Sequence, residues 1–453
     1  MNNMTEALVQ RVFSAPKWED LKADTKENLQ KGLLDYLVCC YTTVAYDTHF
    51  PNVWNARLFP DAAHENALVI GIREKAHPYD ACFLNGYAAH ALDLDDVHSE
   101  IRGHPSAVIL SLLMSLIEQK QDTARFFEAY LIGVEVMTRI SKTVGKSHYE
   151  KGFHTTATAG MYGAVAAGAY YMTLQEKEFN QALDLCVSQI SGSRSHFGTL
   201  IKPLHAGLTA QKAWQILHLV KQGVAGNGNT ITAENGLLSM FGNEDSSIDS
   251  LLDEWGLEWA VDKPGFWFKL YPCCSANAHP IDATKALMRD WEVDLKQIAS
   301  IQLYFPENGD AALIYTNPKN GEQGRFSAEY CAALLLTGRE LSMEAFLGEE
   351  IPEEVSALMN KITRVYDENI PFASVSYPVN RYSMIEISLR NGDIKQARCD
   401  IPYGSPGNPL GREDLIEKAD KLLQQKAMPF IEIFQQEETV TLEKLLPLLK
   451  AES

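Results

Sequence analysis

One segment of the chain, 158–174, consists almost entirely of small and apolar residues and limits the folds that the chain can adopt. Its sequence, TAGMYGAVAAGAYYMTL, is dense in glycine and alanine and contains no charged residue. Small side chains let neighbouring helices approach closely, which predicts a helix at the centre of a helical bundle. No other feature of the chain argues for a membrane, so we interpret this segment as a buried helix and not as a membrane span.

The N-terminal part of the chain, up to about residue 265, has the residue periodicity of helices. The segment 29–46 is apolar on nearly all faces, which predicts a buried helix. In the segment 125–144, apolar residues recur every three or four positions, as on the buried side of an amphipathic helix. A C-terminal stretch, 412–450, is helical in pattern again. These features predict a large helical domain to which the C-terminal stretch returns.

The pattern changes after residue 266, where segments typical of strands appear. Segment 298–305 alternates between apolar and polar residues. A hairpin is predicted at 383–401, because two alternating segments flank an Asn-Gly dipeptide that suits a tight turn. Predicted helices at 280–291 and 327–336 accompany these strands, so we expect an α+β domain.

The length of the chain, 453 residues, is large for one hydrophobic core and suggests two domains. We predict a helical domain formed by 1–267 together with 402–453. An α+β domain at 268–401 is inserted before the C-terminal helices. The predicted fold class is therefore mostly α, with a smaller α+β domain.

The net charge of −19 limits the partners that the chain can bind. A nucleic-acid-binding surface needs basic residues, so no nucleic-acid partner is expected. An acidic protein repels anions at long range, so an anionic substrate requires a local cationic site. The eight cysteines include no CxxC pair, and the N-terminal residues lack the pattern of a signal peptide. We therefore expect a cytoplasmic protein with reduced cysteines, no structural zinc and no membrane partner.

Histidines are concentrated in one part of the chain and indicate acid–base chemistry. All 12 lie at or before His279, and seven of them lie between His90 and His205. Histidine titrates near neutral pH, which suits a general acid or base. Taken one at a time, such histidines are more often helix caps or satisfied core residues, so the concentration is the informative feature.

The segment richest in polar residues is 85–106, with the sequence NGYAAHALDLDDVHSEIRGHPS. If it is helical, Asp93 and Asp96 share one face while Asp95 points elsewhere. His104 precedes a proline, so its ring can project from a loop and act with the carboxylates as acid and base. Two other interpretations stay open, a capped helix end with solvated aspartates and a metal site. The possible metal ligands lack a fixed spacing such as HExxH; they are Asp93, Asp95, Asp96, His98 and His104.

Three further segments carry candidate binding residues. In GFHTTATAG, His154 precedes a predicted helix start that suits either a bound anion or a hydroxyl cap with nothing bound. In SGSRSHFGTLIKPLHAG, Lys202 offers a positioned ammonium for a carboxylate, although most lysines are solvated surface residues. In FKLYPCCSANAH, at the domain change, Cys273 and Cys274 lack an assignable partner and are interpreted first as packing residues. The motifs GxGxxG, GxxxxGK[ST] and GxSxG do not occur, which argues against the common nucleotide sites and serine hydrolases.

The motifs of the chain, taken in order, resemble those of the MmgE/PrpD family. They are NGYAAHALDLDDVH, GHPSAV, GFHTTATAG, KPLHAG, KLYPCCSANAH, GRFSAEY and PYGSPGNPL, and together they cover nearly the whole chain. That family contains 2-methylcitrate dehydratase, cis-aconitate decarboxylase and iminodisuccinate epimerase. The resemblance implies a large helical domain with a smaller α+β lid domain, a homodimer, a site between the two domains, and no metal or organic cofactor.

The resemblance also implies six site residues by their positions in these motifs: Asp93, His104, His154, Lys202, His279 and Tyr330. Tyr330 enters through GRFSAEY alone and is otherwise a helix-packing tyrosine. Val97 and His98 depart from the Thr-Trp pair of the decarboxylase and, similarly, of the dehydratase. Because a site built for a polar group rejects analogues when its pairing changes, this departure argues against a faithful cis-aconitate decarboxylase and weakens the dehydratase assignment.

These residues suggest removal of a proton from the carbon next to a carboxylate of a small di- or tricarboxylic acid. The developing charge would be stabilised by three groups that bind carboxylates: Lys202, His154 and His279. Asp93 or His104 would be the base, and the other of the two, or Tyr330, the acid. Our first expectation is dehydration of a 2-methylcitrate-like or citrate-like substrate, which would make the protein a carbon–oxygen lyase.

Four alternatives accompany this expectation. The runner-up is an isomerase that epimerises a substituted succinate such as iminodisuccinate. A cis-aconitate-type decarboxylase is the next. A metal-dependent hydrolase that uses the aspartates, and a non-catalytic protein that binds carboxylates, are hypotheses from other classes.

Overall fold

The computed structural model describes residues 4–60, 67–117, 121–423 and 429–449. The chain forms two compact units. The first comprises Met1–His196, Leu200–Phe266 and Gly411–Ser453, and the second comprises Phe197–Thr199 and Trp267–Leu410.

The C-terminal end of the second unit lies at residue 410, whereas the predicted domain ended at residue 401. The loop 402–410 packs within the second unit, because the backbone N–H of Phe268 donates to the carbonyl of Gly404 at 3.1 Å. Gly404 has a φ of 89°, and a Cβ there would lie 2.3 Å from the carbonyl oxygen of Phe268. A glycine is therefore needed where these two backbone segments meet.

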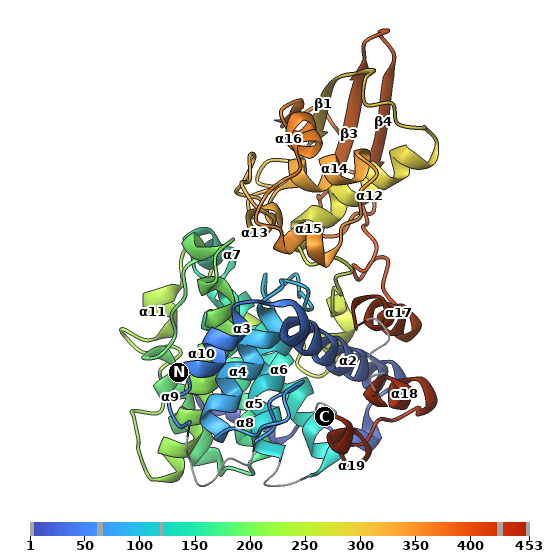
Figure 1. The fold of residues 1–453 in the computed structure, drawn as a ribbon. Coiled ribbons are helices and arrows are strands. Elements are labelled where there is room, and N and C mark those ends of the chain that lie inside the picture. Colours follow the sequence, from blue (N-terminus) through green and yellow to red (C-terminus); the bar gives the residue numbers. More distant parts are fainter. Residues whose placement is uncertain (1–3, 61–66, 118–120, 424–428, 450–453) are drawn as a thin grey trace. The chain divides into compact units, whose positions relative to one another are not determined.

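The first unit is helical, and helix α8, Thr155–Tyr171, is completely buried in it. The prediction from its small residues is confirmed, although the helix ends three residues earlier than the predicted segment. Helix α8 contacts α5 (Pro105–Leu116), α6 (Thr123–Val144) and α10 (Ile201–Lys221) (Figure 1). At Gly163 an added Cβ would lie 2.6 Å from the carbonyl oxygen of Gly133 in α6, so glycine permits the close approach of these two helices.

Other helices complete the first unit. The two predicted helices at 29–46 and 125–144 are confirmed as α2, Ala23–Tyr46, and α6. Helix α4 is Pro78–His90, and it contacts α2, α5 and α10. The remaining helices are α1 Met4–Phe13, α3 Phe50–Asn55, α7 Lys146–Glu150, α9 Glu176–Val187, α11 Leu237–Phe241, α17 Arg412–Leu423, α18 Pro429–Gln436 and α19 Leu442–Leu445. Of the predicted helical stretch 412–450, residues 424–428 and 450 lie outside the described residues.

The second unit contains a four-stranded sheet with the strand order β2-β1-β3-β4. Strands β1 (Ile298–Tyr304) and β2 (Ile362–Val365) are parallel, and β3 (Ser383–Leu389) is antiparallel to both β1 and β4 (Ile394–Cys399). The predicted strand at 298–305 and the predicted hairpin are confirmed, with Gly392 of the turn at a φ of 94°. Strand β2 was not predicted.

Helices pack against this sheet and complete an α+β unit. Helix α12, Ala278–Arg289, contacts β3, β4 and α14, Ala328–Leu336. The shorter helices are α13 Gly321–Gly324, α15 Met343–Leu347 and α16 Glu353–Met359. The predicted fold class, mostly α with an α+β portion, is confirmed.

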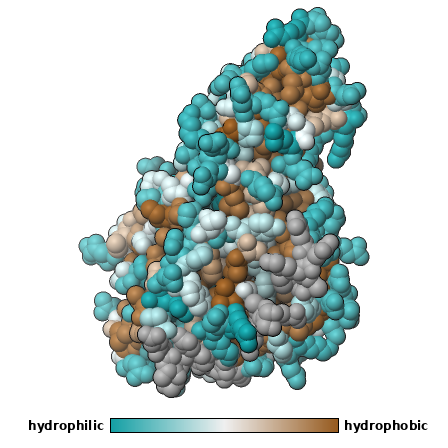
Figure 2. Space-filling view, viewed as in Figure 1, coloured by the Kyte–Doolittle hydropathy of each residue, from teal (hydrophilic) through white to brown (hydrophobic). Residues whose placement is uncertain are grey.

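The described helices include none that is both long enough and apolar enough to cross a bilayer. On the face shown in Figure 2, hydrophilic residues surround smaller groups of hydrophobic ones. The long apolar helices of the first unit, α5 and α8, have every residue buried in protein.

Candidate active site

Helix ends bring the polar residues of the first unit together. His90 is the last residue of α4, and a loop leads from it to His104, which directly precedes α5. Pro105 occupies the first position of α5, where its fixed φ suits a helix start and its missing N–H costs no helical hydrogen bond. His154 directly precedes α8, and Lys202 lies in the first turn of α10. Three helix N-termini, each with partial positive charge, thus border the same cluster.

The centre of the cluster is an ion pair between Lys202 and Asp93. The ammonium of Lys202 donates to Asp93 Oδ1 at 2.9 Å and to His90 Nε2 at 3.0 Å. His104 Nε2 lies 3.6 Å from the same Oδ1 of Asp93. Of the six predicted site residues, four lie in this unit, and none of those four is more than 8% exposed. The structure therefore brings Asp93, His104 and Lys202 into one buried group.

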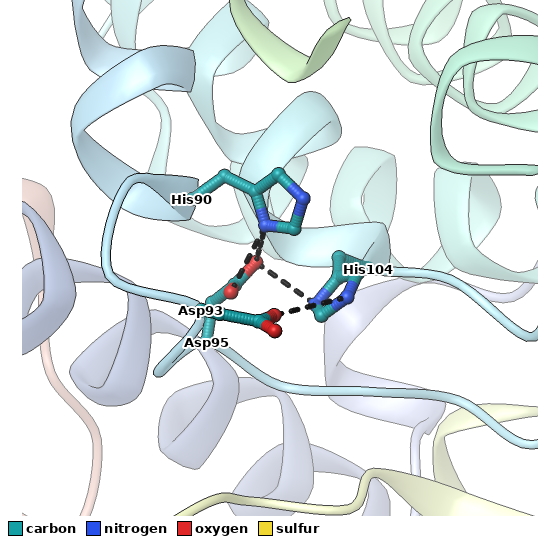
Figure 3. A group of neighbouring side chains, drawn as sticks. All are labelled: His90, Asp93, Asp95 and His104. Carbon is teal, nitrogen blue, oxygen red and sulfur yellow. Dashed lines mark hydrogen bonds and ion pairs between the residues drawn. The ribbon is translucent and has the colours of Figure 1, made fainter. Parts of the chain in front are cut away.

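A second carboxylate, Asp95, lies between the rings of His90 and His104 (Figure 3). His90 Nδ1 is 2.9 Å from Asp95 Oδ2, and His104 Nδ1 is 3.1 Å from the same oxygen. The two ring centroids are 4.3 Å apart. Asp95 therefore fixes the orientation of both imidazoles.

The hydrogen bonds of His90 define its tautomer. An ammonium can only donate, so Nε2 of His90 accepts from Lys202, and Nδ1 carries the proton that it donates to Asp95. Burial and the nearby Lys202 ammonium lower the pKa of His90 to about 3, against the opposing effect of Asp95. His90 is therefore a neutral imidazole that links the ammonium to the carboxylate.

The charge state of Asp95 follows from its two neighbours. Burial acts to raise the pKa of Asp95, but the adjacent imidazoles of His104 and His90 outweigh burial and hold the pKa well below its usual value. Asp95 is consequently a carboxylate. It is placed to stabilise positive charge on His104, as a buried acid does beside a histidine base.

The helical arrangement considered for 85–106 is wrong for its aspartates. Helix α4 ends at His90, and Asp93 adopts a left-handed φ of 51°. Asp93 and Asp95 therefore both face the cluster, while Asp96 points away and accepts from Ser106 Oγ at 2.5 Å. Burial, reinforced by the carboxylate of Asp35, raises the pKa of Asp96 well above its usual value. Sequence spacing alone could not show that Asp95 faces the cluster and Asp96 does not, because contacts with residues distant in the sequence set the path of the loop.

His154 adjoins the cluster and is paired with a further histidine. Its ring stacks near that of His90, with centroids 5.8 Å apart. Its Nδ1 lies 3.0 Å from Nδ1 of His205, which is one turn beyond Lys202 on α10. Burial, Lys202 and His90 hold the pKa of His154 well below its usual value. His90 and His205 belong to the motifs quoted above, but sequence reasoning did not select them, and it considered Asp95 only as a possible metal ligand.

The other two predicted site residues, His279 and Tyr330, belong to the second unit. His279 Nε2 bonds to the carbonyl of Tyr377 at 3.0 Å, and burial lowers the pKa of His279 to about 3. The hydroxyl of Tyr330 donates to the carbonyl of Ala345 at 2.7 Å, and burial raises its pKa to about 12. Their role in the site stays a prediction. Cys273 packs in the hydrophobic core of this unit, as its interpretation as a packing residue predicted.

The cluster has the composition of a possible metal site. Ligand atoms of His90, Asp93, Asp95 and His104 all lie within 4.8 Å of one another. The Lys202 ammonium already donates to two of these residues, Asp93 and His90. A cation therefore occupies the position between two of the candidate ligands. The positive charge of this ammonium would repel a metal ion bound to the same ligands.

Comparison with known proteins assigns the chain to a family. The chain matches the MmgE/PrpD N-terminal domain over residues 10–248 and the MmgE/PrpD C-terminal domain over residues 271–438. The two matches cover most of the chain, and the protein therefore belongs to the MmgE/PrpD family. The family predicted from the ordered motifs is confirmed.

Similar proteins carry the name cis-aconitate decarboxylase. The Homo sapiens protein of that name is 26% identical over 357 residues, which cover 75% of this chain and 72% of that protein. The protein of that name from Aspergillus terreus (strain NIH 2624 / FGSC A1156) is 23% identical over 429 residues, or 88% of this chain and 85% of its own. A cis-aconitate decarboxylase-like protein from Aspergillus oryzae is 23% identical over 435 residues, with 90% and 88% covered.

Proposed function

We propose that the protein is a lyase that acts on a small tricarboxylate by removing or adding a proton at the carbon next to a carboxylate. The observation that carries this proposal is the buried Lys202 ammonium, 2.9 Å from Asp93 Oδ1, an oxygen that also lies 3.6 Å from His104 Nε2. In a chain with a net charge of −19, such a group supplies the local positive charge that an anionic substrate needs. The names of the relatives support the same substrate class.

Binding of the anion is supported by groups whose charge is already in place. The N-termini of α5, α8 and α10 border the cluster and favour negative charge. When a proton leaves the carbon, the adjacent carboxylate gains enolate character, and positive groups already in the site stabilise that charge. Lys202 is the group that we assign to this role.

The base that we assign is His104. Its Nδ1 lies 3.1 Å from the Asp95 carboxylate, which would stabilise the imidazolium formed when Nε2 takes up a proton. Asp93 is a weaker candidate for the base, because Lys202 already neutralises it. A substrate carboxylate that draws the ammonium away would favour protonation of Asp93. Asp93 can then serve as the acid.

The specific reaction that we propose is dehydration of a citrate-like or 2-methylcitrate-like acid. Dehydration uses both a base for the carbon-bound proton and an acid for the departing hydroxide, and His104 and Asp93 supply such a pair 3.6 Å apart. Decarboxylation of cis-aconitate is the second candidate, because the similar proteins carry that name. Decarboxylation needs only the acid, since the departing carboxylate leaves its electron pair on the carbon.

The test is proton NMR of the purified protein in D₂O with a panel of acids. The panel contains citrate, 2-methylcitrate, cis-aconitate and iminodisuccinate. We expect an unsaturated product from one of the first two acids. Deuterium should enter that acid at the carbon next to a carboxylate, where the removed proton is replaced when the reaction reverses. Itaconate formed from cis-aconitate would show that the reaction is a decarboxylation and not a dehydration. Iminodisuccinate with an inverted stereocentre would show that it is an epimerisation. A folded protein that neither exchanges a proton of any acid nor forms a product from one would contradict the proposal.

A further inference from the structure

His154 and His205 form a pair of rings whose Nδ1 atoms point toward each other. Their Nδ1 atoms face each other at 3.0 Å, with ring centroids 5.2 Å apart. Two nitrogens at this distance must share one proton, so one ring donates and the other accepts. The same proton therefore determines whether Nε2 of His154 carries a hydrogen.

The pair also spans a change in exposure. His154 is 1% exposed and stacks near His90 of the cluster, whereas His205 is only half-buried. The ring of His196, also half-buried, follows with its centroid 6.2 Å from that of His205. A line of imidazoles thus leads from the buried cluster toward the surface of the first unit.

The backbone at Gly192 maintains this pair. Its carbonyl accepts from the backbone N–H of His154 at 3.1 Å. Gly192 has a φ of 141°, and an added Cβ would lie 2.8 Å from Ala157 Cβ and 3.6 Å from His205 Nδ1. Glycine is therefore favoured where the chain covers the two rings.

We propose that His154 and His205 form a proton relay between the buried cluster and solvent. This inference rests on the function proposed above, because only a reaction that moves protons needs such a path. The four predicted site residues of this unit are at most 8% exposed, so a proton taken from or given to the substrate needs a route past them. His205 touches no reacting atom in this scheme and acts through His154.

The transfer balances proton by proton. The proton that His104 takes from the substrate leaves the cluster when it reaches Nε2 of His154. Its arrival is matched by release of the Nδ1 proton of His154 to Nδ1 of His205. His205 then loses its Nε2 proton to water. One proton enters, one leaves, and both rings finish neutral in the opposite tautomer. Transfer in the reverse direction restores the first tautomer and delivers a proton to the cluster.

The experiment compares His205→Gln with wild-type protein on the acid that the NMR panel identifies. Glutamine keeps a polar side chain but cannot pass a proton between two nitrogens. We expect turnover and deuterium exchange to fall on the order of tenfold or more, as for loss of a proton-transfer group. Added imidazole should restore part of both. The affinity for propane-1,2,3-tricarboxylate, an unreactive acid, should stay at the wild-type value.

The matched control is His218→Gln, on the same helix. His218 is half-buried and stacks on Trp214, with its Nδ1 2.8 Å from the carbonyl of Trp214. This control should turn over like wild type. Normal turnover in His205→Gln, or slow turnover that imidazole does not change, would overturn the relay while the proposed function stands. Wild-type protein that converts none of the acids would overturn the proposed function and the relay with it.

Discussion

At the scale of single residues, the ammonium of Lys202 joins two networks that would otherwise be separate. It neutralises Asp93 and, through the neutral ring of His90, is coupled to the carboxylate of Asp95. The Asp95 carboxylate also lies 3.1 Å from His104. A substrate carboxylate that approaches Lys202 therefore competes with Asp93 and alters the charge that His104 experiences. Binding and proton transfer are linked through one side chain.

Replacement of Lys202 by alanine tests this linkage. The variant loses the fixed positive charge, and we expect turnover to fall about 100- to 1,000-fold, the range for removing one group that stabilises a developing anion. Steady-state kinetics with the acid identified by NMR measures this. Lys212→Ala is the control, because Lys212 lies on the same helix and donates to the carbonyl of Gln189, away from the cluster. A Lys202→Ala variant with near-normal rates and a normal melting profile would remove the residue from the mechanism.

At the scale of secondary-structure elements, helix α17 fixes the loop that carries the acidic residues. Lys418 of α17 is 3% exposed, and its ammonium donates to Asp35 Oδ1 of α2 at 2.6 Å and to the carbonyl of Leu94 at 3.0 Å. Leu94 lies between the two aspartates of the site. A C-terminal helix thus positions the loop through a contact between residues 324 positions apart.

Replacement of Lys418 by methionine should both destabilise the protein and reduce turnover. The change leaves the carboxylate of Asp35 buried without its cation, which typically costs about 3–5 kcal/mol. Urea unfolding followed by circular dichroism measures the loss. Lys421→Met is the control on the same helix, since Lys421 pairs with Glu417 at the surface and such pairs contribute about 0–1 kcal/mol. Equal stability of the two variants would refute the anchoring role of α17.

Helix α8 offers a second test at this scale, with two glycines one turn apart. At Gly163 an added Cβ would lie 2.6 Å from the carbonyl oxygen of Gly133, whereas at Gly160 its nearest neighbour would be 3.5 Å away. Gly163→Ala should destabilise the protein by about 1–3 kcal/mol through overpacking. Gly160→Ala should be neutral or stabilising by up to about 1 kcal/mol, because alanine favours the helix. Thermal unfolding of both variants distinguishes close packing from helix propensity.

At the scale of the whole molecule, the sequence predicted features that depend on local pattern and missed those that depend on distant contacts. The small residues of α8 and the Asn-Gly turn between β3 and β4 carry their own structural information. Strand β2 has four residues and is defined by its parallel pairing with β1, about sixty residues earlier, so no local pattern marks it.

The candidate site shows the same division. Its motifs could be found in the sequence, but the direction of each side chain could not. Asp95 faces the cluster because Lys418 holds the neighbouring Leu94 and because His98 Nε2 bonds to the carbonyl of Ala260 at 3.0 Å. His205 joins His154 because α8 and α10 pack together. These contacts join residues more than fifty positions apart, beyond the reach of helical or strand periodicity.

Buried neutral histidines give the whole molecule a predictable response to acid. Burial lowers the pKa of His90 and of His279 to about 3 and that of His98 to about 4. His90 and His98 lie in the first unit and His279 in the second, so both units contain such a group. In the unfolded chain these rings titrate near pH 6.5. Between that pH and the folded pKa the unfolded state binds more protons, so stability falls as the pH falls.

We therefore expect the free energy of unfolding to decrease between pH 7.5 and pH 5, by about 2 kcal/mol for each of these histidines. Urea unfolding at the two pH values measures the decrease. The variant His98→Gln isolates one contribution, because His98 lies outside the proposed site and its ring bonds to the backbone carbonyl of Ala260. Glutamine cannot take up the proton in the unfolded state. Whatever its stability at pH 7.5, this variant should lose about 2 kcal/mol less than wild type on acidification. An unchanged pH difference would mean that His98 titrates alike in the folded and unfolded states, and burial would then not be the source of acid lability.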